Sequence, residues 1–218
     1  IEGNGRLIER QVDFDGAVST LKLGKHLVAK VQIEQTDSGK TTLFYSGDEN
    51  FVKSIREDLK DNRLELTGKR LVSGVHNLNI RIQTPKLSRI EQYSVGTISL
   101  EGAFTADTME VEMNSVGNID IKSLTATLLT VNSDGVGSVE VAGHARKATL
   151  KVKGVGGIDA LELVADTVIA RVEGLASIRC NPVTYLNASL RGIGSITYKD
   201  NPASKTTTTV GLGHVGKD

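Results

Sequence analysis

Apolar and polar residues alternate along much of this chain, which is the pattern of β-strands with one buried side. Residues 109–113 read Met-Glu-Val-Glu-Met, and residues 149–153 read Thr-Leu-Lys-Val-Lys. Because successive side chains of a strand point to opposite sides of a sheet, each segment has one apolar side and one charged side. The pattern predicts an all-β chain whose strands cover a shared core.

From residue 93 onward, a repeat of about twenty residues organises these strands. The unit is a small residue, an apolar residue, a glycine, a variable residue and a β-branched apolar residue. The centre of the unit falls at Gly96, Gly117, Gly137, Gly156, Ala176, Gly194 and Gly213. These centres are 18 to 21 residues apart. One such unit per turn is typical of a β-solenoid, in which each rung stacks on the next.

Stacked in register, the repeats form ladders of like residues. The position two after the centre is β-branched and apolar in every copy: Ile98, Ile119, Val139, Ile158, Ile178, Ile196 and Val215. The position one before the centre is also apolar throughout: Val95, Val116, Val136, Val155, Leu175, Ile193 and Leu212. We expect the apolar ladders to fill the interior, and the small residues to mark a corner where the backbone bends tightly.

Two residues test this interpretation. Cys180 belongs to a further inward ladder, whose other members are Leu100, Ile121, Val141 and Ala160. It is therefore expected to be a small core residue rather than a nucleophile. Ala176 stands where the other copies have glycine. Since residues with a Cβ rarely adopt a positive φ, either that corner does not need one or its rung is distorted.

The first half of the chain is rich in strands but lacks a regular repeat. Strands are predicted over residues 6–14, 18–23, 27–35, 41–46, 63–67 and 78–84. The prediction is an irregular β-rich region over residues 1–88 and a regular solenoid over residues 89–218, continuous with each other.

One short helix is predicted over residues 48–59. Asp48 is a suitable N-cap, and Phe51, Ile55 and Leu59 are spaced by four residues. We expect this helix to cap one end of the solenoid or cover one flank of the sheet, because an open last rung offers unpaired backbone groups to other chains.

The composition narrows the possible partners. Lys plus Arg and Asp plus Glu number 26 each, so no net charge favours nucleic acid as a partner. Aromatic residues make up 4% of the chain, which is low for a stacking platform. A single cysteine excludes an intrachain disulfide, and no apolar run is long enough to form a transmembrane segment.

An acidic ladder is the strongest candidate for chemistry. Asp120, Glu140 and Asp159 each follow an inward residue by one position, so they are expected on one outer face, one rung apart. Three stacked carboxylates could hold Ca²⁺ or could include the acid pair of a polysaccharide lyase or hydrolase. We favour a solvated face relieved by Arg179, because no cluster of Arg, Lys and aromatic partners accompanies the acids.

No other residues group into a site. The four histidines, His26, His76, His144 and His214, are far apart in the sequence. No nucleophile elbow, phosphate loop or dinucleotide fingerprint is present. We therefore predict no catalytic residue, no metal site and no cofactor.

Several motifs resemble those of the auto-transporter adhesin head GIN domain family. The repeats Gly117–Asp120 and Gly156–Asp159 resemble its GIN repeats, and Gly3–Gly5 resembles its start. Similar motifs lie at residues 47–52, 62–66, 84–87, 194–198 and 201–202, while Ala176, Arg179 and His214 depart from the pattern. The resemblance implies a right-handed parallel β-helix in a bacterial protein that is secreted or attached to the envelope. It supplies no catalytic residues.

Two functions remain open. The first is a non-enzymatic, adhesin-like module of the bacterial surface that binds an unknown glycan or protein. The alternative is a pectinase-like β-helix enzyme that uses Asp120, Glu140 and Asp159. We expect a secreted, periplasmic or outer-surface location with a leader peptide removed, because residues 1–5 read like the interior of a longer chain.

The last rung suggests a self-association surface. Residues 206–215 look like the start of a further rung, and no capping helix follows them. Its exposed edge is expected to pack against another copy, to fold back on the N-terminal sheet, or to fray.

Overall fold

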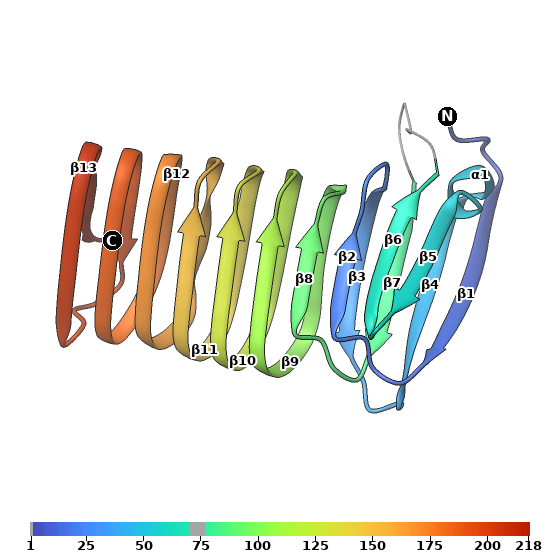
Figure 1. Ribbon diagram of the computed structural model, residues 1–218, viewed down its shortest axis with the longest axis horizontal. Helices are drawn as coiled ribbons and strands as arrows, with labels where there is room; N and C mark the ends of the chain where they lie inside the picture. Colours follow the sequence, from blue (N-terminus) through green and yellow to red (C-terminus); the bar gives the residue numbers. More distant parts are fainter. Residues whose placement is uncertain (1, 70–76) are drawn as a thin grey trace.

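The computed structural model describes residues 2–69 and 77–218 as a nearly all-β solenoid with one short helix. Its rungs stack along the long axis of the molecule (Figure 1). The fold class predicted from the repeat is confirmed. Stacked parallel coils make up about six turns.

The regular rungs are built from long, bent strands. They are β9 (Val95–Met113), β10 (Val116–Ser133), β11 (Val136–Val152), β12 (Val155–Tyr198) and β13 (Ser204–Lys217). Each pairs in parallel with the next, and the register between β10 and β11 shifts between Ile121 and Leu124. This irregularity divides each rung into a shorter first segment and a longer second one. We call the two sides of the solenoid that these segments form the first face and the second face.

Shorter strands extend both faces toward the N-terminal end. They are β1 (Leu7–Asp15), β2 (Thr20–Leu23), β3 (Val28–Gln35), β4 (Lys40–Asp48), β5 (Ile55–Lys60), β6 (Arg63–Gly68), β7 (Asn79–Thr84) and β8 (Arg89–Gln92). The first face continues in the order β9, β3, β7, β4, β1, and the second face in the order β9, β8, β2, β6, β5. The strands predicted for this half are confirmed.

The helix predicted over residues 48–59 is wrong beyond its first turn. Helix α1 covers only Glu49–Val52, and β5 follows it. The Asp48 carboxylate does not cap the helix and instead accepts a hydrogen bond from the Gly5 N–H at 2.7 Å.

A turn that the sequence pattern did not reveal explains the strand. Asp61 and Asn62 have φ of 51° and 60°, and Lys60 pairs with Arg63. Two consecutive residues with positive φ form the tight turn that joins antiparallel strands, and Asp and Asn tolerate this conformation well. The turn draws β5 into a hairpin with β6.

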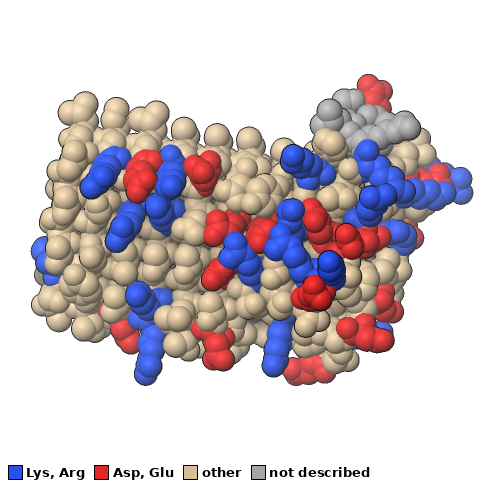
Figure 2. Space-filling view, viewed as in Figure 1, with Lys and Arg blue, Asp and Glu red and all other residues tan. Residues whose placement is uncertain are grey.

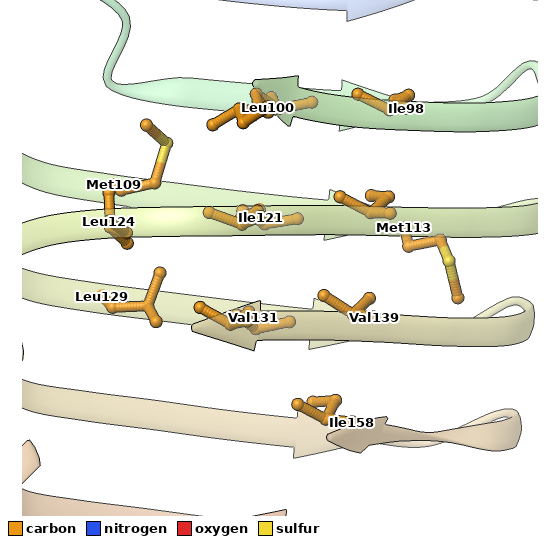
Figure 3. Packing of buried hydrophobic residues seen from close by; sticks show 14 of the residues in the cluster. Ile98, Leu100, Met109, Met113, Ile121, Leu124, Leu129, Val131, Val139 and Ile158 are labelled. Carbon is orange, nitrogen blue, oxygen red and sulfur yellow. The ribbon is translucent and has the colours of Figure 1, made fainter. Parts of the chain in front are cut away.

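The interior contains the ladder two residues after each repeat centre. Its first six members, from Ile98 to Ile196, are buried, and Val215 in the last rung is partly buried. Figure 3 shows Ile98, Val139 and Ile158 directed into the space between the two faces, where Met109 and Leu129 also lie. Cys180 is buried in this core, as predicted, and burial raises the pKa of its thiol to about 12.

The corner before this ladder explains the glycine at the repeat centre. Gly137 has φ of 141°, and a Cβ added there would lie 1.8 Å from the Gly117 carbonyl oxygen. Ala176 does not have a positive φ. In its rung Gly174, two residues earlier, has φ of 145°. That corner therefore does not need positive φ at the central position.

Candidate functional site

The outer surface of the first face carries three rows of like side chains that run from rung to rung. Parallel pairing in register stacks each outward residue on its equivalent in the next rung, about 4.8 Å away. The rows are an apolar row, a hydroxyl row and an acidic row.

The apolar row is the ladder one residue before each repeat centre. Its members are Val95, Val116, Val136, Val155, Leu175, Ile193 and Leu212. They are 47% to 76% exposed, so the prediction that this ladder fills the interior is wrong. Each member lies three positions before a buried residue, and strand alternation places residues three apart on opposite sides.

The hydroxyl row lies next to the apolar row. It consists of the variable residues of the repeat, which carry a hydroxyl in four rungs, at Thr97, Ser138, Ser177 and Ser195, and are Asn118, Gly157 and His214 in the others. The side-chain amide oxygen of Asn118 accepts hydrogen bonds from the backbone N–H and the hydroxyl of Ser138, at 3.2 and 3.0 Å. A shallow hollow of about 580 Å³ is lined by members of both rows and also by Glu140, Asp159 and Arg179. The surface thus offers apolar contact beside hydrogen-bonding groups.

The acidic row lies beyond the hydroxyl row. Asp120, Glu140 and Asp159 are paired in register on β10, β11 and β12, as predicted. They line a second hollow, of about 350 Å³, and none of the three is buried. In the described part of the chain, no group of three His, Cys, Asp or Glu side chains is arranged to hold a metal ion.

Ion pairs neutralise one end of the acidic row. One Arg179 nitrogen lies 2.8 Å from an Asp159 oxygen, and another lies 3.1 Å from an Asp218 oxygen. Hydrogen bonds to Asp218 and Asp159 raise the pKa of Arg179, and the bond from Arg179 holds the pKa of Asp218 below its usual range. The relief by Arg179 expected from the sequence is therefore present, and it acts on Asp159.

The line of the acidic row extends across the N-terminal strands, where the residues in register with it are not acidic. In register beside Ser99 on β9 lie Gln32 on β3, Arg81 on β7, Phe44 on β4 and Gln11 on β1. The sequence pattern did not predict that these residues lie in line with the acidic row, because the order of these strands does not follow from a repeat. The alternation of outward residues along β4 was the only signal for Phe44.

The second face is charged in a different way (Figure 2). Acidic and basic side chains intermingle there over β8, β2 and β6. Glu91, whose side chain is 8% exposed, accepts hydrogen bonds from Arg63 and Arg89, and Arg89 also pairs with Glu110 on β9. Burial is the largest single influence on the pKa of Glu91, and it acts to raise it. The hydrogen bonds and charges of Arg89 and Arg63 together outweigh burial, so the pKa of Glu91 is lowered. The network ties the N-terminal strands to the first regular rung.

The histidines do not form a site in the described chain. His26 lies in the turn before β3, His144 lies on β11 and His214 lies on β13, so three different parts of the solenoid carry them. His76 lies outside the described residues. The described histidines thus add no metal or catalytic candidate to those that the sequence offered.

The fold and the surface first define a class: a parallel β-solenoid whose outer first face carries rows of side chains that repeat from rung to rung. Residues 22–202 match the family model described as putative auto-transporter adhesin, head GIN domain. The chain belongs to this family of adhesin-like surface proteins. The resemblance seen in the sequence is confirmed.

Solved structures agree with this assignment. A putative adhesin from Bacteroides fragilis is 35% identical, with a TM-score of 0.94 and complete coverage of both chains. A putative lipid binding protein from Parabacteroides distasonis is 20% identical, with a TM-score of 0.79 over 100% of this chain and 99% of that one. A putative adhesin from Parabacteroides merdae is 19% identical, with a TM-score of 0.74 over 100% and 98%. These last two similarities show the fold alone.

A search of curated proteins gave no match. In the described part of the chain, no helix is long and apolar enough to cross a membrane.

Proposed function

We propose that this chain is a non-enzymatic binding module of the bacterial envelope or surface, and that the outer first face binds its ligand. The single observation that carries this proposal is the exposure of the apolar row beside the hydroxyl row along seven rungs. Extended apolar patches bordered by polar groups typically mark interaction surfaces. Membership of an adhesin family supports the same reading.

The shape of this surface favours an elongated ligand. The rows repeat at the spacing of the rungs, so the same contacts recur along the solenoid. A glycan or an extended protein segment that lies across several rungs gains from each contact, whereas a small molecule meets only one or two. The location that fits this role is secreted, periplasmic or outer-surface.

Binding should depend on the apolar row. We expect the double variant Val136→Lys and Val155→Lys to lose binding on glycan arrays and on panels of matrix proteins, because two ammonium groups would lie within the apolar row. The matched control is Leu128→Lys with Val183→Lys, since these residues are similarly exposed but lie outside the three rows. Loss of binding by both double variants, or by neither, would contradict the proposal.

The enzymatic alternative rests on the acidic row. Retaining glycosidases use two carboxyl groups about 5–5.5 Å apart, and carboxylates on adjacent rungs can approach that separation. However, Asp159 is engaged by Arg179, and the hollow over the row is shallow and open to solvent. Turnover of pectins and host glycans, with and without Ca²⁺, tests this alternative. Activity that Asp159→Asn abolishes would favour the enzyme.

We also propose that the C-terminal edge mediates self-association. In the described chain β13 pairs only with β12, and its stretch Thr206–Gly213 carries no charged residue. A long uncharged edge is able to pair with a second copy. Hydrogen exchange of this segment should slow as protein concentration rises. Fast exchange at every concentration would mean that the edge frays.

A further inference from the structure

A stacked arginine marks the N-terminal end of the first face. The Arg81 guanidinium carbon lies 4.4 Å from the centre of the Phe44 ring, and the two residues are paired across β7 and β4. Stacking on an aromatic ring restrains the planar guanidinium and leaves its N–H groups free at the edge. Arg81 is exposed, and no described residue forms an ion pair with it.

A neighbouring arginine shows what distinguishes Arg81. Arg10 also stacks on an aromatic ring, that of Tyr45, at 4.5 Å. Its guanidinium, however, pairs with Glu57 of β5 at the end of the core. The charge of Arg10 is therefore satisfied within the protein, whereas that of Arg81 faces solvent.

The surroundings of Arg81 are rich in neutral hydrogen-bonding groups. Arg81 and Phe44 line a hollow of about 460 Å³ together with Gln11, Gln32, Ser46 and Asn79, and the stacked pair of Arg10 and Tyr45 also reaches its wall. Gln32 is paired in register with Arg81, and Asn79 is paired with Ser46. Amides and hydroxyls both donate and accept hydrogen bonds, so they suit a ligand that carries several hydroxyl groups.

We propose that this hollow binds an acidic sugar unit through its carboxylate. The guanidinium fork matches the two oxygens of a carboxylate, and the amides and the hydroxyl of Ser46 match the ring hydroxyls. Glu9 also lines the hollow and repels a dianionic phosphate more strongly than a single carboxylate. The inference rests on the proposed function, because it assigns a ligand class to one end of the binding face.

The test uses glucuronate and galacturonate as probes, with glucose as the neutral control and inorganic phosphate as a competitor. Titrations followed by ¹H–¹⁵N NMR should shift the side-chain amide signals of Gln32 and Asn79 with either uronate and not with glucose. Arg81→Gln should weaken uronate binding about tenfold or more, because a charge-assisted bidentate contact is lost. Arg81→Lys should also weaken it, since an ammonium keeps the charge but lacks the fork.

The matched control is Arg171→Gln. Arg171 is exposed on the second face and forms no ion pair with a described residue, so uronate binding should be unchanged. Equal binding of glucose and uronate, stronger binding of phosphate, or unaltered binding by Arg81→Gln would each overturn the inference. If uronate binding fails while array binding still depends on Val136 and Val155, the inference fails and the proposed function stands. If uronate binds but array binding does not depend on Val136 and Val155, the proposed binding surface is wrong and the uronate site at Arg81 stands.

Discussion

The regular rungs and the N-terminal strands cover the same core by different means. Between β9 and β13 every strand pairs in parallel with its equivalent in the next rung. The N-terminal end instead contains three antiparallel pairs, β1 with β4, β4 with β7 and β5 with β6, as well as parallel pairs between strands that are distant in sequence. Repetition produces a uniform surface, whereas the irregular end produces individual sites.

The two regions also differ in side-chain chemistry. Phe44, Tyr45 and their stacked arginines belong to the N-terminal strands, as do Arg63 and Arg89, which pair with the buried Glu91. The regular rungs rely on small and β-branched residues packed at glycine corners. We therefore expect substitutions of the corner glycines to destabilise the rungs most strongly. At the N-terminal end, we expect the loss of side-chain contacts to have the larger effect.

The largest expected effect is at a rung corner. Gly137→Val should lower the free energy of unfolding by roughly 2–4 kcal/mol, because its Cβ would overlap the Gly117 carbonyl and its φ is unfavourable. Gly39→Val in the turn before β4 is the matched control, since Gly39 also has a positive φ but has open space around it. Urea denaturation followed by circular dichroism measures both. Equal losses would show that close packing at the corner has no special role.

The ion-pair network should give a smaller, pH-dependent effect. Glu91→Gln should cost roughly 1–3 kcal/mol near neutral pH, because three charge-assisted hydrogen bonds from two arginines are weakened. The folded pKa of Glu91 is lowered, so its contribution is complete above the unfolded pKa of about 4.3 and is lost as the pH falls through the folded pKa.

The measurement compares unfolding of the wild type and the variant at pH 7 and at pH 3. The difference in stability between the two proteins should shrink at pH 3. A difference that stays constant between these pH values would show that the Glu91 charge does not stabilise the N-terminal end.

The smallest effect is expected in the acidic row. Replacing Asp120 and Asp159 by Asn and Glu140 by Gln should leave the melting temperature unchanged or slightly raised, because exposed like charges on adjacent strands repel weakly. Differential scanning calorimetry with Ca²⁺ or EDTA provides the control. A large fall in melting temperature, or melting that depends on calcium, would indicate a structural metal site instead.

The sequence predicted those features that repetition determines. Once the repeat was aligned, the buried ladder from Ile98 to Ile196 and the register of Asp120 with Glu140 and Asp159 followed, because every rung obeys the same geometry. The apolar row was misplaced, although its distance of three residues from the buried ladder contained the correct answer. At these positions strand alternation, and not apolar character, decides which side of the strand faces the core.

The N-terminal end could be predicted only in part. Its strands have clear alternation, but their order across the sheet depends on pairings such as Phe44 with Arg81 that no repeat specifies. Asp61 and Asn62 form a tight turn through their positive φ values, and this turn replaced most of the expected helix with a strand. Local spacing of Phe51, Ile55 and Leu59 fitted a helix, but pairing with β6 was the stronger influence.

The most direct test of the central claim is an NMR titration of methyl-labelled protein with the ligand found on the arrays. If the outer first face binds the ligand, the methyl signals of Val116, Val136, Val155 and Ile193 should shift, because these residues lie on that face. The signals of Leu128 and Val183, which are exposed outside the three rows, should remain in place. Shifts confined to Leu128 and Val183, with none in the apolar row, would contradict the assignment of the first face as the binding surface.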